Sequence, residues 1–400
     1  MNPLHLIVFR FLLGVYLVQH FALLIPYAGE LFSNQGVFPD ATRLPAYGVF
    51  PNLLFFFDAP WFAQLFVAIL TLVSLGLTLA WRPRLCAFLL YLGWAMLLAR
   101  APFIANPSIP FIGLLLLAIA ITPSDIHDQK FEKISAPLWK GMWVLMALSY
   151  TVSGIHKLGS PSWVDGSAMQ ELALNPLARD YFVNQMLAAA PRWLSQCLTW
   201  SALALEILFA PLCLLRVLRP FVWLAMIGMH VGILFVVSFA DLTVGMLLLH
   251  LFTFDNRWIP PRSRQGTTNP IVFFDGACVM CNKFARLLLR LDHAARFRLA
   301  PLQGETFLTS LPAAEREKLP DSIVVRGDAG EVLSRSRALL YIGDGLGGFP
   351  RMLCFFAMLL PRALLDAGYN LVARVRHRVF GRSAELCALI PPDEKTRFLP

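Results

Sequence analysis

The sequence predicts a polytopic all-α membrane domain of about eight transmembrane helices, followed by a smaller C-terminal α/β domain. Hydrophobic residues make up 57% of the 400 residues and charged residues only 15%, unlike a soluble globular protein. Residues 1–258 contain long apolar runs of roughly bilayer length, whereas shorter strand-like and helix-like runs alternate after residue 269. These observations predict three parts: a membrane domain (1–258), a linker (259–269) and a C-terminal domain (270–392).

Each predicted span is an apolar run that reaches, or nearly reaches, the length needed to cross a bilayer. The eight runs are His5–Pro26, Trp61–Ala80, Leu85–Ala99, Ile109–Thr122, Leu138–Leu158, Trp193–Leu215, Phe221–Ala240 and Leu242–Phe254. The fourth and eighth are short against the roughly 20 residues of a typical span. The expected count is therefore seven to nine, with eight preferred.

Basic residues in the short loops predict the orientation. Arg82 and Arg84, Arg216 and Arg219, and three arginines within residues 257–264 all fall on one side if eight spans are counted. Both termini are then cytoplasmic, and residues 28–60 and 159–192 lie outside. The expected location is the inner (plasma) membrane.

The fifth predicted span carries a polar stripe. Tyr150, Ser153 and Lys157 recur at i, i+3 and i+7, so they share one face that must contact protein or water. Other ionisable residues of the spans add to this set of candidates: His20, Glu206, His230 and His250. They indicate a polar cavity or proton route, although packing, or snorkelling in the case of Lys157, also explains each one. No cofactor is specified, and a quinone-like or other hydrophobic ligand is the class that such a cavity favours.

Charge divides the chain near the linker. Residues 1–255 hold 13 Lys and Arg against 12 Asp and Glu, whereas residues 256–400 hold 21 against 13. A cationic domain beside an anionic leaflet predicts contact with the lipid bilayer. Nucleic acid is not expected as a partner, because no basic motif with interleaved aromatic residues is present.

The C-terminal domain opens with a redox motif. A strand-like run, Ile271–Phe274, leads into Asp275-Gly-Ala-Cys278-Val-Met-Cys281 and then into a helical pattern. Cysteines spaced i and i+3 at a helix start lie on one face, where the helix dipole favours anionic sulfur. We therefore expect Cys278 to be the more exposed thiol, with a lowered pKa, and to attack, while Cys281 resolves.

Two other interpretations of the cysteine pair remain open, namely a metal site and an inert pair. A structural zinc site needs two further ligands, but Cys354 and Cys387 are single and far apart, so no metal is predicted.

The rest of this domain predicts a small sheet. Strands are expected at 296–299, 322–326 and 331–334, and helices at 281–291, 312–318 and 336–342. With the CxxC pair at the first strand-to-helix junction, this order is typical of a thioredoxin-like domain.

These residues also carry a family resemblance. Asp275, Cys278 and Cys281, the later predicted helix Tyr369–Arg378 (YNLVARVRHR) and Cys387 resemble the DCC family of predicted thiol-disulfide oxidoreductases over about residues 270–392. The resemblance implies dithiol redox activity toward an unknown thiol or disulfide partner.

The membrane half has a second resemblance. Gly154-Ile-His-Lys157-Leu, followed by Trp163-Val-Asp-Gly166, is similar to the HTTM domain shared with vitamin K-dependent gamma-carboxylases, over about residues 1–258. It implies that Lys157 corresponds to the proposed base of those enzymes, while His156 stands where they have another lysine.

Three functions follow as hypotheses. The preferred one is a membrane-bound thiol-disulfide oxidoreductase that uses the CxxC dithiol, coupled to a hydrophobic ligand in the membrane domain. The alternative is a transporter or binding protein for a lipid-like or quinone-like molecule, with a redox-sensing CxxC domain. A carboxylase-like enzyme with Lys157 as base is the third.

Overall fold

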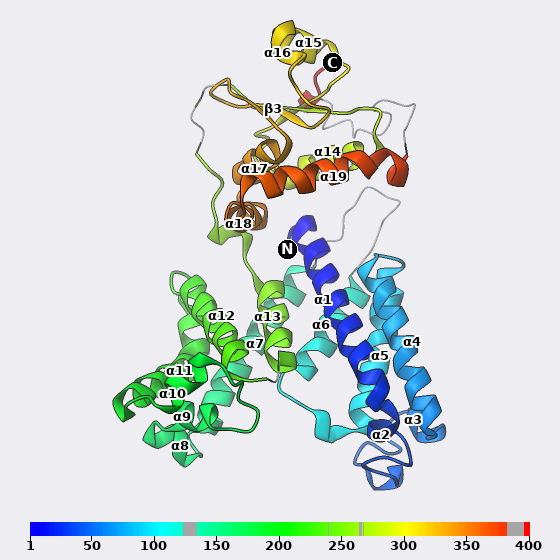
Figure 1. Ribbon diagram of the computed structural model, residues 1–400, viewed down its shortest axis with the longest axis vertical. Coiled ribbons are helices and arrows are strands. Elements are labelled where there is room, and N and C mark those ends of the chain that lie inside the picture. The colour runs from blue at the N-terminus through cyan, green and yellow to red at the C-terminus, as the bar shows by residue number, and fades with distance from the viewer. Residues whose placement is uncertain (123–133, 239, 264–265, 267, 382–395) are drawn as a thin grey trace. The chain divides into compact units, whose positions relative to one another are not determined.

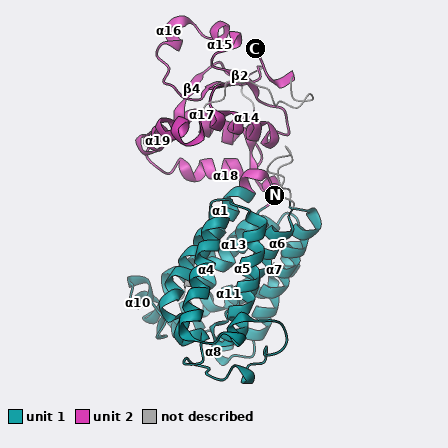
Figure 2. Cartoon of the chain, turned by 90° about the vertical axis from the view of Figure 1, so that its right-hand side faces the viewer, with its two compact units in different colours: residues 1, 6–254 teal, residues 2–5, 255–400 magenta. Residues whose placement is uncertain are grey.

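The computed structural model describes residues 1–122, 134–238, 240–263, 266, 268–381 and 396–400. The chain divides into two compact units, coloured separately in Figure 2: residues 1 and 6–254 form unit 1, and residues 2–5 and 255–400 form unit 2. Cys387 lies outside the described residues.

Unit 1 is helical, and each of the eight apolar runs coincides with a helix (Figure 1). The helices are α1 (Pro3–Leu24), α4 (Pro60–Thr78), α5 (Pro83–Arg100), α6 (Ile109–Ile121), α7 (Ala136–Lys157), α11 (Arg192–Leu214), α12 (Arg219–Val236) and α13 (Ala240–Thr253). Six of them have proline in the first two positions, where the missing N–H group costs nothing. Apolar composition and these prolines explain why the helices begin where they do.

Short helices fill the connections. They are η1 (Ile25–Tyr27), α2 (Ala28–Phe32), η2 (Ala41–Arg43), α3 (Leu53–Phe56), η3 (Pro102–Ile104), α8 (Pro161–Asp165), α9 (Ala168–Ala173), α10 (Phe182–Ala188) and, in unit 2, η4 (Asn256–Trp258).

Several long apolar helices suggest that the chain associates with a membrane. Among the described residues, five helical segments are long and apolar enough to cross one: Pro3–Phe32, Pro60–Thr78, Pro83–Arg100, Arg192–Leu214 and Arg219–Val236. They expose large apolar side chains, including Leu72 and Leu224, as helices do where they face lipid. α6 and α13 are apolar but short, and α7 contains Lys140, His156 and Lys157. The expected eight spans therefore remain a prediction.

Unit 2 contains a four-stranded mixed sheet in the order β2-β1-β3-β4. Its strands are β1 (Ile271–Phe274), β2 (Arg298–Pro301), β3 (Val324–Arg326) and β4 (Val332–Ser334). β1 is parallel to β2 and antiparallel to β3, which is antiparallel to β4. The register is set at β1, where Val272 lies opposite Leu299 on one side and Val325 on the other.

The alternation of side chains along β1 builds a core on each face of the sheet. Val272 and Phe274 pack with α14 (Val279–Leu291) and α17 (Arg335–Leu346). Phe273 points to the other face, where it packs against Phe307 of α15 (Glu305–Ser310); α16 (Ala313–Arg316) follows in the chain. The sheet is therefore covered on both faces, as expected from a strand that is buried on both sides.

Two further helices complete unit 2, α18 (Gly348–Ala357) and α19 (Arg362–Phe380). Gly347 and Gly348 adopt positive φ angles of 70° and 55°, which allow an abrupt turn between α17 and α18 that other residues would resist. α18 and α19 are long and apolar enough to cross a membrane only when they are taken together, and their axes are bent by 116° relative to each other.

Candidate functional site

The junction between β1 and α14 places both cysteines on the first turn of a helix. Cys278 has extended backbone angles (φ −94°, ψ 119°) and caps α14, with its Sγ accepting a hydrogen bond from the Cys281 N–H at 3.4 Å. The Cys278 N–H donates to the Asp275 carbonyl at 3.2 Å, which closes the preceding turn. Both residues are free thiols at the positive end of the helix dipole, which favours a thiolate.

Both cysteine side chains are buried. Cys278 is 0% exposed and Cys281 3%, so the prediction that Cys278 is the more exposed thiol is wrong. The reason is α19, which packs against α14 (Figure 1). It brings Arg376 and His377 against the cysteine turn.

Asp275 connects the cysteine turn to Gln303 and to α19. Its Oδ1 accepts hydrogen bonds from the Ala277 N–H and the Gln303 side chain, both at 3.1 Å. Its Oδ2 lies 3.4 Å from an Arg376 nitrogen and 3.6 Å from Nε2 of His377. The carboxylate is thus held by the turn on one side and by α19 on the other.

Arg376 and His377 are the site residues that sequence reasoning missed. The Arg376 side chain is buried, bridging Asp275 to Asp321 at 2.7 Å. The segment YNLVARVRHR was noted only as part of the family resemblance. Its arginines and histidine were the available signal, but nothing local showed that two of them reach the cysteines.

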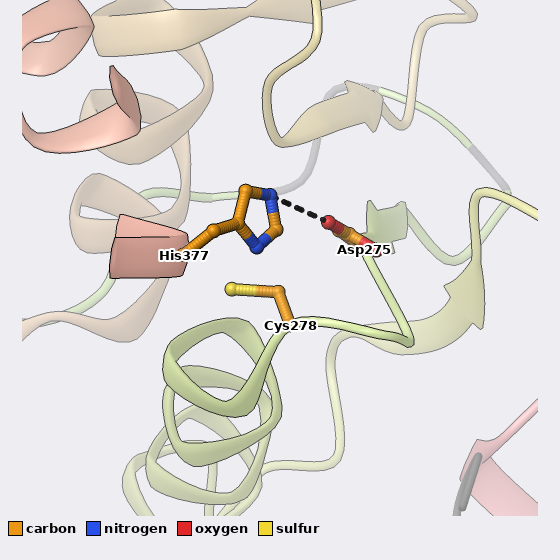
Figure 3. A group of neighbouring side chains, drawn as sticks. All are labelled: Asp275, Cys278 and His377. Atoms are coloured by element: carbon orange, nitrogen blue, oxygen red, sulfur yellow. Dashed lines mark ion pairs between the residues drawn. The ribbon is translucent and has the colours of Figure 1, made fainter. Parts of the chain in front are cut away.

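Three donor types meet beside Cys278. A carboxylate oxygen of Asp275, Sγ of Cys278 and a ring nitrogen of His377 lie within 4.8 Å of one another. Figure 3 shows the imidazole between the carboxylate and the thiol. Oxygen, sulfur and imidazole nitrogen can hold zinc. However, the buried Arg376 guanidinium already faces the same carboxylate, and its charge opposes a second cation there.

The Cys281 thiol is strongly perturbed. Burial, and then the hydrogen bond with Cys278, raise the pKa of Cys281 from 9.0 to about 12, whereas the Arg376 charge acts in the opposite direction. Cys281 therefore keeps its proton at neutral pH in this dithiol state.

In unit 1, the polar stripe of α7 meets a carboxylate of α11. Lys157 Nζ contacts both carboxylate oxygens of Glu206 at 2.5 Å, and the Ser153 hydroxyl donates to the same group at 3.3 Å. The Trp163 ring lies 4.5 Å from Nζ. Lys157, Trp163 and Glu206 line a cavity of about 660 Å³ whose other walls are mostly apolar.

The remaining membrane candidates form a second group. The Tyr150 hydroxyl and His230 Nε2 are hydrogen-bonded at 2.7 Å, and the rings of His230 and His250 lie 5.9 Å apart. All three side chains are buried. His156, in contrast, is exposed and does not line the Lys157 cavity.

A third, half-buried polar group was not predicted as a unit. The Asp241 carboxylate accepts hydrogen bonds from Tyr16 at 2.6 Å and Asn106 at 3.1 Å and pairs with His20 at 2.9 Å. Tyr16, His20 and Asp241 line an open, largely apolar groove of about 650 Å³ between α1 and α13. Asp241 directly precedes the last apolar run, so this pairing across 225 positions left no local pattern.

Comparisons with known proteins match unit 2. A family model described as DCC1-like thiol-disulfide oxidoreductase matches residues 272–382. The uncharacterized protein YuxK of Bacillus subtilis (strain 168) is 33% identical over 137 residues, which are 33% of this chain and 95% of that protein. A chloroplastic DCC family protein of Arabidopsis thaliana is 32% identical over 115 residues, covering 28% of this chain and 66% of the relative. No solved structure matches.

Proposed function

Because this chain belongs to the DCC1-like thiol-disulfide oxidoreductase family, we propose that it is a membrane-bound thiol-disulfide oxidoreductase that uses Cys278 and Cys281 as its dithiol. The placement of both sulfurs on the first turn of α14 carries this proposal. The charge of Arg376 beside them supports it, because a positive group stabilises a thiolate.

In the proposed reaction, the Cys278 thiolate attacks one sulfur of a partner disulfide. A bond between Cys278 and the partner forms, the partner S–S bond breaks, and one partner sulfur leaves as a thiolate. Cys281 then attacks the Cys278 sulfur, closes the Cys278–Cys281 disulfide and releases the second partner sulfur. The partner gains two electrons and two protons, and the dithiol loses them. Because Cys278 is buried, the side chains that cover it must open before the partner disulfide can reach the sulfur.

We propose a thioredoxin-like fold for unit 2. Its support is the CxxC turn between β1 and α14, the parallel β1–β2 pair and the antiparallel β3–β4 pair that follows.

Trapping of the partner tests the redox assignment. Cys281→Ser should accumulate a mixed disulfide through Cys278, because the resolving thiol is missing, and this species should appear on non-reducing gels of acid-quenched cells. Cys278→Ser should trap none, and Cys354→Ser is the control that should behave as the wild type. Equal trapping by the Cys278 and Cys281 variants, or no redox-dependent alkylation of either residue, would sink the assignment.

For unit 1 we propose an HTTM-like membrane domain of eight spans that binds a quinone-like or other hydrophobic molecule. The cavity beside Lys157 and Glu206 supports ligand binding, because it combines mostly apolar walls with a few charged groups, the Lys157–Glu206 pair and Glu171, as small-molecule sites usually do. A transporter or binding protein with a redox-sensing CxxC domain would use the same cavity.

A short-chain benzoquinone tests this cavity with the full-length protein in detergent. The quinone should raise the thermal unfolding midpoint of the wild type by a few degrees, since a ligand that binds only the folded state stabilises it. The shift should be lost in Lys157→Ala. It should be retained in His156→Ala, because His156 directly precedes Lys157 in the chain but its side chain is exposed. Equal shifts in both variants would remove the cavity as the binding site.

A further inference from the structure

The exposed apolar side chains of unit 2 gather on α18 and α19. In the part of unit 2 that the structure describes, twelve large apolar side chains are exposed, and eleven of them lie between residues 355 and 380. The eleven, called here the α18–α19 surface, are Phe355, Phe356, Met358, Leu359, Leu360, Leu364, Leu371, Val372, Val375, Val379 and Phe380. Soluble proteins rarely leave such a cluster in water, so it indicates a surface that another apolar body covers.

The two sides of α19 have different roles. The inner side packs against α14 and α17, where the Tyr369 hydroxyl accepts a hydrogen bond from the Ile323 N–H at 2.8 Å and Arg376 bridges Asp275 to Asp321. The outer side carries an apolar stripe whose members are seven, four and four positions apart, which places them on one helix face: Leu364, Leu371, Val375 and Val379. The packing of unit 2 thus occupies the inner side and leaves the stripe uncovered.

We infer that the α18–α19 surface binds the surface of the lipid bilayer, with anionic headgroups beside its arginines. The inference rests on the proposed membrane-bound state of the chain. Unit 2 begins at Asp255, two positions after α13 of the proposed membrane domain ends at Thr253. The chain therefore keeps unit 2 close to the bilayer, whichever side of the membrane it occupies.

The charge of this segment fits anionic lipid. Residues 348–380 contain five arginines and a single acidic residue, Asp366. Asp366 is half-buried and accepts a hydrogen bond from the Ser336 hydroxyl, whereas Arg374 and Arg378 are exposed beside the apolar stripe. An apolar face flanked by arginines is typical of a helix that lies in the membrane interface. A second copy of this chain would bring the same positive charge against it, which disfavours self-association here.

The geometry favours a segment that lies on the membrane over one that crosses it. α18 has ten residues, so it is about 15 Å long, half of the hydrocarbon thickness. The bend of 116° prevents α18 and α19 from forming one straight span. The inner side of α19 also keeps Arg376 in contact with two carboxylates of unit 2, which a crossing helix would have to give up.

This contact would bring the dithiol near the bilayer. The cysteine turn lies against the inner side of α19, and the lipid would lie against its outer stripe. One helix diameter, about 10 Å, then separates the sulfurs from the membrane surface.

Lipid photocrosslinking tests the inference with the wild-type, full-length protein. The protein is reconstituted in vesicles of phosphatidylcholine and phosphatidylglycerol that contain a phospholipid with a diazirine on its acyl chain. After irradiation, tryptic peptides are searched for lipid adducts by mass spectrometry. Residues 352–362 and 363–374 should carry at least about fivefold more adduct than residues 299–316, because an interfacial apolar face reaches the acyl chains. Residues 299–316 are the matched peptide, since they contain Leu308, the exposed apolar side chain outside the α18–α19 surface.

Charge reversal tests the contribution of the arginines. Arg374→Glu combined with Arg378→Glu should lower the adduct on residues 352–362, a peptide that these changes leave intact, by at least about threefold. Lys283→Glu combined with Lys318→Glu makes the same charge change at exposed lysines elsewhere in unit 2 and should label as the wild type does. Equal losses in the two double variants would contradict a specific role of this surface.

Residues 193–216 of α11 separate the possible failures. If they carry adducts while residues 352–362 and 363–374 carry no more than residues 299–316, the bilayer does not cover the α18–α19 surface. Unit 1 or a second copy would then be its occupant, and the inference would be overturned. If residues 193–216 carry no adduct either, the proposed membrane-bound state itself fails, and the inference fails with it.

Discussion

At the scale of single residues, the Cys281 thiol couples proton binding to the stability of the reduced protein. Its pKa is raised from 9.0 to about 12, first by burial and then by Cys278. A raised pKa means that the folded state holds the proton more tightly than the unfolded chain. The stabilisation is therefore complete below about pH 9 and is lost as the pH rises from about 9 to about 12.

This linkage predicts a difference between variants at alkaline pH. Between pH 8 and pH 10, the reduced wild type should lose about 1 kcal/mol more stability than Cys281→Ala, which has no thiol to ionise. Resistance of unit 2 to proteolysis during denaturant titration of the full-length protein measures it. Cys197→Ala, which removes an exposed thiol, should follow the wild type. Parallel behaviour of wild type and Cys281→Ala would show that Cys281 titrates normally.

At the scale of elements, residues 396–400 add a segment to the edge of the sheet beside β2. Phe398 forms a parallel bridge with Leu299, and the Leu399 N–H donates to the Leu299 carbonyl at 2.8 Å. The Arg397 guanidinium pairs with the buried carboxylate of Asp292 and donates to the Phe297 carbonyl at 3.1 Å. This segment thus holds the end of α14, whose first turn carries the cysteines.

Removing the Arg397 side chain should therefore weaken unit 2. Arg397→Ala leaves Asp292 without its counter-charge, and the loss of a hydrogen-bonded charge costs about 1.5 to 3 kcal/mol. The same proteolysis titration measures this cost. Arg298→Ala, which removes an exposed arginine of β2, should change stability by less than about 0.5 kcal/mol. Equal losses would show that Arg397 has no specific role.

The elements of unit 2 were more predictable than their contacts. β1 was expected at 271–274 because four apolar residues lie between Pro270 and Asp275, and it forms there. α19 was also expected as a helix, but its role at the site was not, because Asp275 and Arg376 are 101 positions apart. The periodicity of a sequence shows which residues share one face of a helix or strand, but it does not show which other residues that face contacts. The burial of Cys278 was mispredicted for the same reason.

At the scale of the whole molecule, the number of spans decides on which side the redox unit lies. The eight apolar runs all form helices, but among the described residues five segments are long and apolar enough to cross a membrane by themselves. The two counts differ in α6, α7 and α13. With eight spans, unit 2 and residues 159–192 lie on opposite sides of the membrane, whereas with five spans they lie on the same side. The reason is that α13 lies between these two regions in the chain and crosses the membrane only in the eight-span count.

Two introduced cysteines separate these counts in a Cys197→Ser background, which removes an exposed native thiol. With eight spans, α11, α12 and α13 all cross between Ser162 and Glu317, so these positions lie on opposite sides. A membrane-impermeant maleimide should then label Ser162→Cys in intact cells and label Glu317→Cys, an exposed position of unit 2, only after permeabilisation. With five spans only α11 and α12 intervene, and both positions should react in intact cells. Basic residues of the short loops favour the first outcome, because they gather on one side only when eight spans are counted. Labelling of both positions would place the dithiol outside, where it would meet an oxidising compartment and act as an oxidant rather than a reductant.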